Sequence, residues 1–362
     1  MPAYLPVRSD RMTRRTFLLA GVGGLAAQAV FGAAAGAAVL KIGQIGTKHL
    51  HAAGKMSGLR SLPDHWTVVG LVDSNGGAGT STRDEVYRGL PLMTEAELLA
   101  VSGLRAVAVE TAIVDSCATA DRVIRAGKHV HLDKPGAFGH AEFRAMRLEA
   151  ERRGLVVQMG YMLRYNPAFE LLFHAVRERW LGEVMEIEAF IGKLGTAADR
   201  AYLAALPGGG MFELGCHVID PIVHLLGTPR SVEAYSTPSR DDAIKDNQLA
   251  VLKFERATAT VRVNYADPFG SPRRRFSVTG TEGSFEVRPL ESGQIRLSLR
   301  QACGPYAKGE QNISLPRSGG RYDAEFIDLA RIVHGEKALA WNATHDIAVH
   351  ETVLRASGVL GG

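Results

Sequence analysis

Short apolar runs alternate with stretches of helical periodicity through the first half of the chain. This alternation is typical of a doubly wound parallel sheet that carries helices on both faces. Buried strands are expected at Val39–Ile45, Thr67–Val72, Arg105–Val109, Val130–Leu132 and Leu155–Met159. Helices are expected to begin near His51 and to span Ser116–Ala126 and Ala141–Arg153. The pattern predicts an α/β nucleotide-binding domain over residues 39–160.

Long strands dominate the second half. From Ala257 to Tyr265 apolar and polar residues alternate with a period of two, as in a strand with one buried face. Further strands are expected at Glu183–Ile191, Ser231–Tyr235, Phe276–Val278, Phe285–Val287 and Ile295–Leu299, and helices at Tyr322–His334 and Ile347–Ser357. A single helical layer would leave one sheet face open, so residues 161–362 are expected to form a second α/β domain that associates into a homodimer or homotetramer.

Residues 1–38 have the pattern of an export signal. The pair Arg14-Arg15 precedes a run without charged side chains from Thr16 to Leu40, and Ala27-Gln28-Ala29 fits a cleavage site. This combination is typical of a Tat signal, so we expect passage through the Tat machinery to the periplasm. The uncharged run is long enough to span a bilayer, and an uncleaved signal would therefore anchor the protein.

Composition excludes several classes of protein. The chain is 46% apolar and 22% charged, as in a soluble protein of about two domains. The formal charge of +4 comes largely from four arginines within residues 1–29, so no nucleic-acid-binding surface is expected. The three cysteines are widely spaced and predict neither a disulfide framework nor a metal-binding cysteine pair.

The end of the first predicted strand carries part of a dinucleotide fingerprint. An intact fingerprint would have glycines at positions 46, 48 and 51, where the chain has Gly46, Lys48 and His51. Lys48 is expected to meet the pyrophosphate; alternatively, Lys48 and His49 only coat a loop. Asp73 ends the second strand, where an acid binds the adenosine ribose, although acids are also common in turns.

The residues after Asp73 favour NAD over NADP, because Ser74 and Asn75 follow it and no arginine does. The ends of the predicted strands supply the further candidates for cofactor contact. The complete set is Gly46, Thr47, Lys48, His49, Asp73, Glu110, Thr111, Asp133 and Lys134.

A lysine and a histidine carry the candidate chemistry. Lys134 follows a buried strand, and Glu213, His217 and Asp220 are spaced to share one face of a helix. His217 is the natural base for an alcohol proton, oriented by Glu213 or Asp220, while Lys134 would donate a hydrogen bond to the reacting oxygen. Arg164, Tyr165 and Asp220 are candidates for substrate contact; alternatively, Arg164 ties the two domains together.

Less specific interpretations of the same residues stay open. Lys134 is also explained as a surface lysine, and the helix as one with a solvated polar stripe. Glu213, His217 and Asp220 have the spacing to hold a divalent cation. No metal is expected, because Lys134 would repel it. Cys216 is expected to pack in the core, as are the histidines of the buried strand, His129 and His131.

Three motifs together resemble the Gfo/Idh/MocA oxidoreductases, the group of glucose–fructose oxidoreductase and inositol dehydrogenase, over about residues 40–358. They are Ala126-Gly-Lys-His-Val…Asp133-Lys-Pro135, Gly160-Tyr-Met-Leu-Arg-Tyr-Asn-Pro167 and Gly208-Gly-Gly…Gly215-Cys-His…Asp220. The resemblance implies an N-terminal Rossmann domain and a C-terminal domain with a large open, mostly antiparallel sheet. It also implies sugar or cyclitol substrates and a catalytic set of Lys134, Glu213 and His217.

The chain departs from this family's pattern at several positions. The second glycine of the phosphate loop is missing, Asp133 replaces a glutamate and Glu213 replaces an aspartate. The segment Thr111–Ser116 replaces the family's Thr-Pro-Asn-x-x-His. The sequence therefore predicts an NAD-dependent oxidoreductase with tightly bound cofactor, while two alternatives stay open. One is an NAD-assisted glycoside hydrolase, and the other is a catalytically silent member that binds a nucleotide or sugar.

Overall fold

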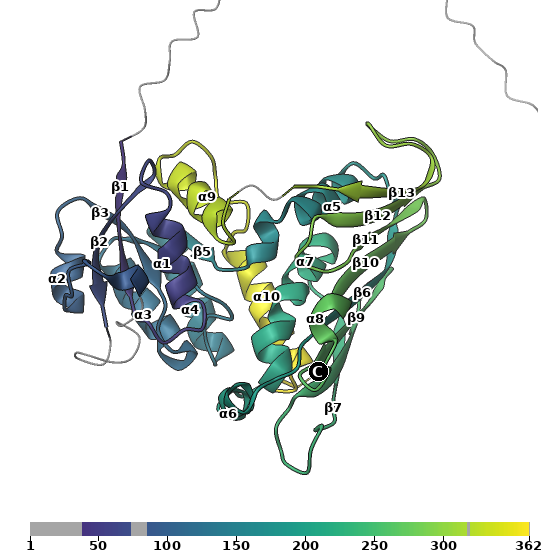
Figure 1. Cartoon of the computed structure of the whole chain (residues 1–362), viewed down its shortest axis with the longest axis horizontal. Coiled ribbons are helices and arrows are strands. Elements are labelled where there is room, and N and C mark those ends of the chain that lie inside the picture. The colour runs from purple at the N-terminus through teal and green to yellow at the C-terminus, as the bar shows by residue number, and fades with distance from the viewer. Residues whose placement is uncertain (1–37, 74–84, 317–318, 362) are drawn as a thin grey trace, which may run out of the picture. The chain divides into compact units, whose positions relative to one another are not determined.

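Two β-sheets of different construction organise the part of the chain that the computed structural model describes, residues 38–73, 85–316 and 319–361 (Figure 1). Residues 1–37 of the predicted export signal lie outside these residues, as do Ser74 and Asn75. Among the described residues, no helix is both long and apolar enough to cross a membrane.

The first sheet is parallel throughout and has the strand order β2-β1-β3-β4-β5. Its strands are β1 (Leu40–Ile45), β2 (Trp66–Val72), β3 (Leu104–Val109), β4 (His129–Leu132) and β5 (Val157–Met159). Its helical segments are α1 (Ala52–Arg60), η2 (Glu85–Tyr87), α2 (Glu95–Leu99), α3 (Ile113–Arg125) and α4 (His140–Arg152). Near-continuous burial along β3 is typical of a strand covered on both faces. The predicted doubly wound fold is confirmed.

The second sheet has the order β13-β12-β11-β10-β6-β9-β8-β7 and is antiparallel except between β6 and β9. Its strands are β6 (Val184–Gly192), β7 (Ser231–Ser236), β8 (Asn247–Lys253), β9 (Thr258–Asn264), β10 (Arg275–Gly280), β11 (Gly283–Val287), β12 (Gln294–Leu299) and β13 (Gly309–Ser314). The predicted period of two holds in β9, where Ala259, Val261 and Val263 are buried. The expected large, mostly antiparallel sheet is therefore confirmed.

Helices cover one face of this second sheet. The helical segments of this half are η3 (Met162–Tyr165), α5 (Pro167–Arg177), α6 (Ala197–Ala204), η4 (Met211–Gly215), α7 (Cys216–Leu226), α8 (Gly270–Arg273), α9 (Asp323–Val333) and α10 (Ala343–Ala356). Of these, α7 contacts β6 and β9, and α10 contacts β7 and β8. The opposite face carries charged side chains such as Arg275 and Glu188, which form an exposed ion pair.

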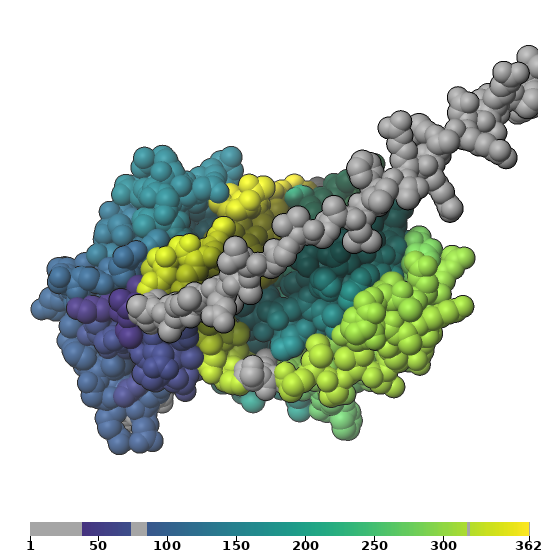
Figure 2. Space-filling view, turned by 90° about the horizontal axis from the view of Figure 1, so that it is seen from above, coloured from purple at the N-terminus to yellow at the C-terminus, as the bar shows by residue number. Residues whose placement is uncertain are grey.

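The last two helices connect the two halves. Phe326 and Leu329 of α9 pack with Leu40 and Trp66 of the parallel sheet, and the indole of Trp66 donates to the main-chain oxygen of Phe326. Helix α10 packs against both α4 and α7. In Figure 2 these C-terminal residues, coloured yellow, lie against the blue N-terminal half. The border predicted at residue 160 separates the sheets, but α9 packs with the first half.

Candidate active site

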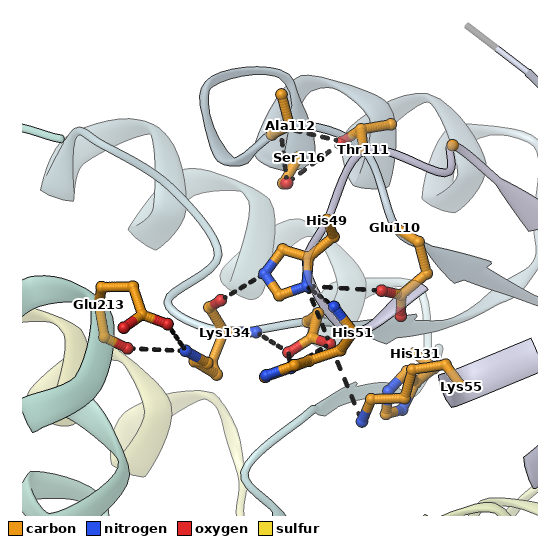
Figure 3. Close-up of polar contacts among 12 residues, drawn as sticks. His49, His51, Lys55, Glu110, Thr111, Ala112, Ser116, His131, Lys134 and Glu213 are labelled. Atoms are coloured by element: carbon orange, nitrogen blue, oxygen red, sulfur yellow. Dashed lines mark hydrogen bonds and ion pairs between the residues drawn. The ribbon is translucent and has the colours of Figure 1, made fainter. Parts of the chain in front are cut away.

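The carboxyl ends of β1, β3 and β4 bring a set of polar side chains to one edge of the parallel sheet (Figure 3). His49 follows β1, Glu110 follows β3 and Lys134 follows β4. Glu213 faces Lys134 from η4, in the second half of the chain. Doubly wound sheets bind their ligands at this edge, beside the reversal of strand order between β1 and β3.

Lys134 and Glu213 form a buried ion pair. The Nζ of Lys134 donates to Oε1 of Glu213 at 3.0 Å and to the main-chain oxygen of Glu213 at 2.7 Å. Burial alone would lower the pKa of Lys134, but the Glu213 carboxylate raises it above its usual value. Burial would raise the pKa of Glu213, but Lys134 and the Tyr265 hydroxyl, which donates to Oε2, bring it to about 2. Lys134 is therefore a fixed, charged donor.

His217 lies in α7, one turn after Glu213, and is only 3% exposed. Burial lowers the pKa of His217 well below its usual value, and the charges of Lys134 and His51 lower it further. The imidazole is neutral near pH 7 and can accept a proton. Its Nδ1 has no hydrogen-bond partner among the described residues. A proton acceptor therefore lies within electrostatic reach of the Lys134 ammonium group.

The carboxylates expected to orient His217 have other partners. The Glu213 carboxylate binds Lys134 and Tyr265. The Asp220 carboxylate accepts from Arg164 at 2.6 Å and lies 3.0 Å from Nε2 of His345. Among the described residues no hydrogen bond joins His217 to Glu213 or Asp220, whose carboxylates are held by other buried donors, so a role of either in orienting the ring stays a prediction. The same contacts argue against a cation held between Glu213, His217 and Asp220.

The phosphate loop contributes two histidines to the site. The Nε2 of His49 donates to the main-chain oxygen of Lys134 at 3.1 Å, and its Nδ1 lies 3.3 Å from Asp133 and 3.7 Å from Glu110. The Nδ1 of His51 lies 3.0 Å from Oδ2 of Asp133. Burial, with Asp133 nearby, raises the pKa of Glu110 well above its usual value. His49 thus belongs to a buried network and does not merely coat a loop.

The turn after β1 retains features that suit a dinucleotide. Gly46 has φ +92°, and a Cβ on it would lie 2.6 Å from the main-chain nitrogen of Thr111, so only glycine fits this turn. Helix α1 follows with no acidic side chain in its first turn, and Lys48 is exposed beside it. Thr47 donates to Asp73 at the end of β2, where a ribose would bind.

Position 51 is where the turn departs from the dinucleotide pattern. The third glycine of the fingerprint allows helix and strand to pack closely, whereas His51 points its ring at Asp133. The residues present therefore fit the phosphate and ribose end of a dinucleotide through Gly46, Lys48 and Asp73. Thr111, the remaining candidate of this region, lies 3.2 Å from the Ser116 hydroxyl at the start of α3.

Arg164 and Asp220, expected to contact substrate, lie in a closed ion network. Arg164 is 1% exposed, and its guanidinium donates to Asp220 and to Asp346, each at 2.6 Å. Arg147 binds the same Asp346 at 2.7 Å. The hydroxyl of Tyr165 donates to Asp328 at 3.2 Å. Arg164, Asp220 and Asp346 all belong to the second half, and Asp346 extends the network to Arg147 of α4 in the first half.

The sequence analysis does not single out three side chains of this region, Tyr265, Lys55 and Glu325. Tyr265 directly follows β9 and donates to Glu213, but as the last residue of an alternating apolar pattern it has no feature that marks it as functional. Lys55 is fully buried in α1, pairs with Glu325 of α9 and lies 4.0 Å from Asp133. Lys55 is buried because α9 packs against the first half of the chain, and local periodicity does not predict that packing.

Of the three residues expected to pack in the core, Cys216 and His131 are buried there and His129 is half-buried. Cys216 is buried, and burial raises the pKa of its thiol to about 12, so it stays protonated. His131 is fully buried, and its Nδ1 lies 3.0 Å from the Gln158 side chain. The Nδ1 of His129, which is half-buried, accepts from the main-chain nitrogen of Val156.

Sequence comparisons identify a domain and several relatives. Residues 169–286 match the GFO/IDH/MocA C-terminal domain. The D-xylose 1-dehydrogenase (NADP(+)) 2 of Haloferax volcanii is 30% identical over 48% of this chain and 51% of its own length. The trans-1,2-dihydrobenzene-1,2-diol dehydrogenase of Bos taurus is 30% identical over 36% of this chain and 38% of its own length. The chain thus spans about half the length, or less, of these two curated relatives.

Structural comparisons cover more of the chain at lower identity. The UDP-N-acetylglucosamine 3-dehydrogenase GnnA of Acidithiobacillus ferrooxidans superposes with a TM-score of 0.75 at 19% identity, covering 90% of this chain and 98% of its own. GenD2 from gentamicin A biosynthesis, solved in complex with NAD, gives a TM-score of 0.71 at 21% identity, covering 90% and 95%. The comparisons support the resemblance to the Gfo/Idh/MocA oxidoreductases and identify a GFO/IDH/MocA C-terminal domain in residues 169–286.

Proposed function

We propose that the protein is an NAD-dependent member of the Gfo/Idh/MocA oxidoreductases that removes hydride from a secondary hydroxyl of a sugar or cyclitol. One observation carries the proposal: a buried ammonium group, Lys134, is fixed by Glu213 within electrostatic reach of the neutral imidazole of His217. A donor for the alcohol oxygen and an acceptor for its proton are the two groups that alcohol oxidation requires from a protein.

Each residue has a separate role in this proposal. Lys134 donates a hydrogen bond to the substrate oxygen and stabilises negative charge there as the proton leaves. His217 accepts the hydroxyl proton, which its neutral form allows. Glu213 acts through Lys134, because it fixes the ammonium group rather than the imidazole. Bound NAD would supply the acceptor for the hydride from the carbon atom that carries the hydroxyl group. Loss of this hydride and of the hydroxyl proton would convert the alcohol into a ketone.

The residues proposed to hold the dinucleotide lie at the ends of β1 to β4. They are Gly46, Thr47, Lys48, His49, Asp73, Glu110, Thr111, Asp133 and Lys134. The acid at position 73 supports NAD over NADP, because it would repel a 2′-phosphate. The name of the Haloferax relative includes NADP(+), so the affinities of this protein for NAD and NADP should be measured side by side. The substrate-binding candidates would act mainly indirectly, because their buried hydrogen bonds hold the elements around the site in position. They are Arg164, Tyr165 and Asp220.

The first test separates the enzyme from a silent binding protein. We expect denatured, natively purified protein to release a nicotinamide dinucleotide, detected by mass spectrometry. Lys134→Ala and His217→Ala should each lower kcat by about 10²- to 10⁴-fold. Lys337→Ala is the matched control, because Lys337 also pairs with a carboxylate, Asp328, but outside this site. Absence of any nucleotide, together with no affinity for added NAD or NADP, would sink the proposal.

The second test separates the oxidoreductase from an NAD-assisted glycoside hydrolase. Both would require the cofactor, Lys134 and His217. A dehydrogenase reduces one NAD for each hydroxyl oxidised, unless a second substrate reoxidises the cofactor. A hydrolase releases free sugar from a glycoside without net reduction of NAD. Product analysis with glycosides and free sugars therefore distinguishes them.

Export and self-association are part of the proposal and rest on the sequence. Arg14-Arg15 and the uncharged run that follows support export to the periplasm by the Tat route, with anchoring if the signal is not cleaved. Export removes the enzyme from the cytoplasmic NAD pool, so we propose a tightly held cofactor. The large second sheet, with helices packed on one face, supports a homodimer or homotetramer. Fractionation of an Arg14→Lys, Arg15→Lys variant and light scattering test these points.

A further inference from the structure

Two histidines and an aspartate converge behind Lys134. His49 and His51 come from the loop after β1, and Asp133 comes from the end of β4. One ligand atom from each of the three side chains lies within 4.8 Å of the others. The Oδ2 atom of Asp133 is 3.0 Å from Nδ1 of His51 and 3.3 Å from Nδ1 of His49. Two imidazole nitrogens and one carboxylate oxygen therefore face a common point.

The remaining atoms of these side chains are held in a way that suits metal ligands. The Nε2 of His49 donates to the main-chain oxygen of Lys134, which leaves Nδ1 as an acceptor; Nδ1 faces Asp133 and also accepts from the main-chain nitrogen of His51 at 3.3 Å, a contact that a metal ion would replace. A metal-ligating histidine commonly donates its other N–H to a backbone carbonyl in this manner. The Oδ1 atom of Asp133 accepts from the main-chain nitrogen of Lys134 at 2.7 Å. This hydrogen bond orients the carboxylate and leaves Oδ2 toward the two histidines.

We propose that His49, His51 and Asp133 bind one divalent transition-metal ion, with Zn²⁺ as the probe. Two imidazoles and one carboxylate suit Zn²⁺, Fe²⁺ or Mn²⁺, whereas Ca²⁺ and Mg²⁺ prefer sites made of oxygen atoms. Glu110 is fully buried, with Oε2 3.7 Å from Nδ1 of His49, and is a further oxygen ligand within reach. The proposed site goes beyond the oxidoreductase function, and it shares His49 and Asp133 with the residues proposed to hold the dinucleotide.

The buried charges around the site answer the objection that lysines repel a cation. Lys55 lies 4.0 Å from Asp133, and Lys134 is adjacent in sequence, but each is paired with its own carboxylate. Glu325 pairs with Lys55 and Glu213 pairs with Lys134. Asp133 remains as a buried carboxylate in excess of these two pairs, and a divalent cation would balance its charge.

The competing interpretation is a network of hydrogen bonds among histidine and aspartate that needs no metal. Metal uptake by tag-free, full-length protein separates the two, with neither cofactor nor substrate added. After treatment with a chelator, the protein should take up one Zn²⁺ per chain, measured by calorimetry and elemental analysis. His51→Gln and Asp133→Asn should each weaken Zn²⁺ binding by at least about tenfold. His129→Gln, which removes a half-buried histidine of β4 outside the cluster, should bind like the unaltered protein.

A spectroscopic variant keeps the proposal testable if a substitution unfolds the protein. His51→Cys preserves a donor atom at position 51, so the Co²⁺-loaded variant should gain a thiolate-to-cobalt charge-transfer band. No uptake by the unaltered protein would overturn the site, as would equal Zn²⁺ affinity in His51→Gln and His129→Gln, or a Co²⁺ spectrum of His51→Cys without the band. None of these results would alter nucleotide release or the effect of Lys134→Ala, so the two proposals fail separately.

Discussion

The Nζ of Lys134 lies 3.0 Å from Oε1 of Glu213, although the two residues are 79 positions apart in the sequence. Lys134 follows a strand of the parallel sheet, whereas Glu213 belongs to the half of the chain that contains the second sheet. The pair joins the end of a parallel strand to the helical segment that precedes His217. Because both groups are buried, removing either one would leave an unpaired charge in the interior and lower the stability of the folded protein. The contact therefore fixes the position of the ammonium group and the relative position of the two elements at once.

Tyr265 is predicted to support this pair. Tyr265→Phe removes the hydroxyl that donates to Glu213 and leaves a buried carboxylate oxygen without that partner. The expected cost is about 1–3 kcal/mol of unfolding free energy, with a smaller loss of kcat than in Lys134→Ala. Tyr235→Phe is a matched control, because Tyr235 makes the same contact with Glu233 at an exposed site. Chemical denaturation of both variants measures the difference, and equal stabilities would contradict the prediction.

Arg164 is predicted to act on stability more than on substrate affinity. Arg164→Gln leaves Asp220 and Asp346 without their shared cation in a buried site. The expected loss is about 3–5 kcal/mol of unfolding free energy. Arg296→Gln removes an exposed pair with Glu310 and should change stability little. A raised KM in an Arg164→Gln protein of unchanged stability would instead assign Arg164 to the substrate.

Gly46 is predicted to be required for both the turn and the cofactor. Gly46→Ala places a Cβ 2.6 Å from the main chain of Thr111 and forces a left-handed backbone on alanine. Gly127→Ala has the same backbone problem, with φ +74°, but its Cβ would meet no atom within 4 Å. Stability should fall by about 1 kcal/mol in Gly127→Ala and by more in Gly46→Ala. Isothermal titration should also detect weaker NAD binding only in Gly46→Ala.

Local periodicity accounts for most of the fold that could be predicted. Strands such as β9 were found because their buried and exposed residues alternate. Strand β13 (Gly309–Ser314) was not found, because an edge strand of polar residues pairs through its backbone and carries no alternation of apolar residues. Helix α9 was found from its apolar face, but a single sequence does not say which sheet that face covers.

The sequence also predicts some features of the candidate site and not others. The positions of Lys134 and Glu213 followed from a strand end and a helical motif, and the structure brings them together. The helical spacing also suggested that Glu213 orients His217, which the structure does not bear out. Spacing along a helix limits which side chains can meet, whereas buried donors elsewhere in the chain decide which of them do. Tyr265 is such a donor, and it lies 52 residues from its acceptor.

His350 is predicted to make the folded state sensitive to acid. It lies in α10 with 1% of its surface exposed, its Nε2 lies 3.0 Å from the main-chain oxygen of Ala137, and its ring stacks on Phe143. Burial lowers its pKa to about 4; the Ala137 contact opposes this shift, and His140 adds to it. The unfolded chain, with an ordinary histidine pKa of about 6.5, therefore binds more protons between these values.

The contribution of His350 to the unfolding free energy should therefore be complete above about pH 6.5. It should decline as the pH falls toward about 4, by roughly 3 kcal/mol over that range. His350→Gln keeps an N–H donor for Ala137 but does not titrate, so its unfolding free energy should fall less steeply with acid. His129 and His224, whose pKa values burial also lowers to about 4, keep some of the slope in every variant. Urea denaturation at a series of pH values measures these slopes, and parallel curves for His350→Gln and the unaltered protein would show that His350 is not the group responsible.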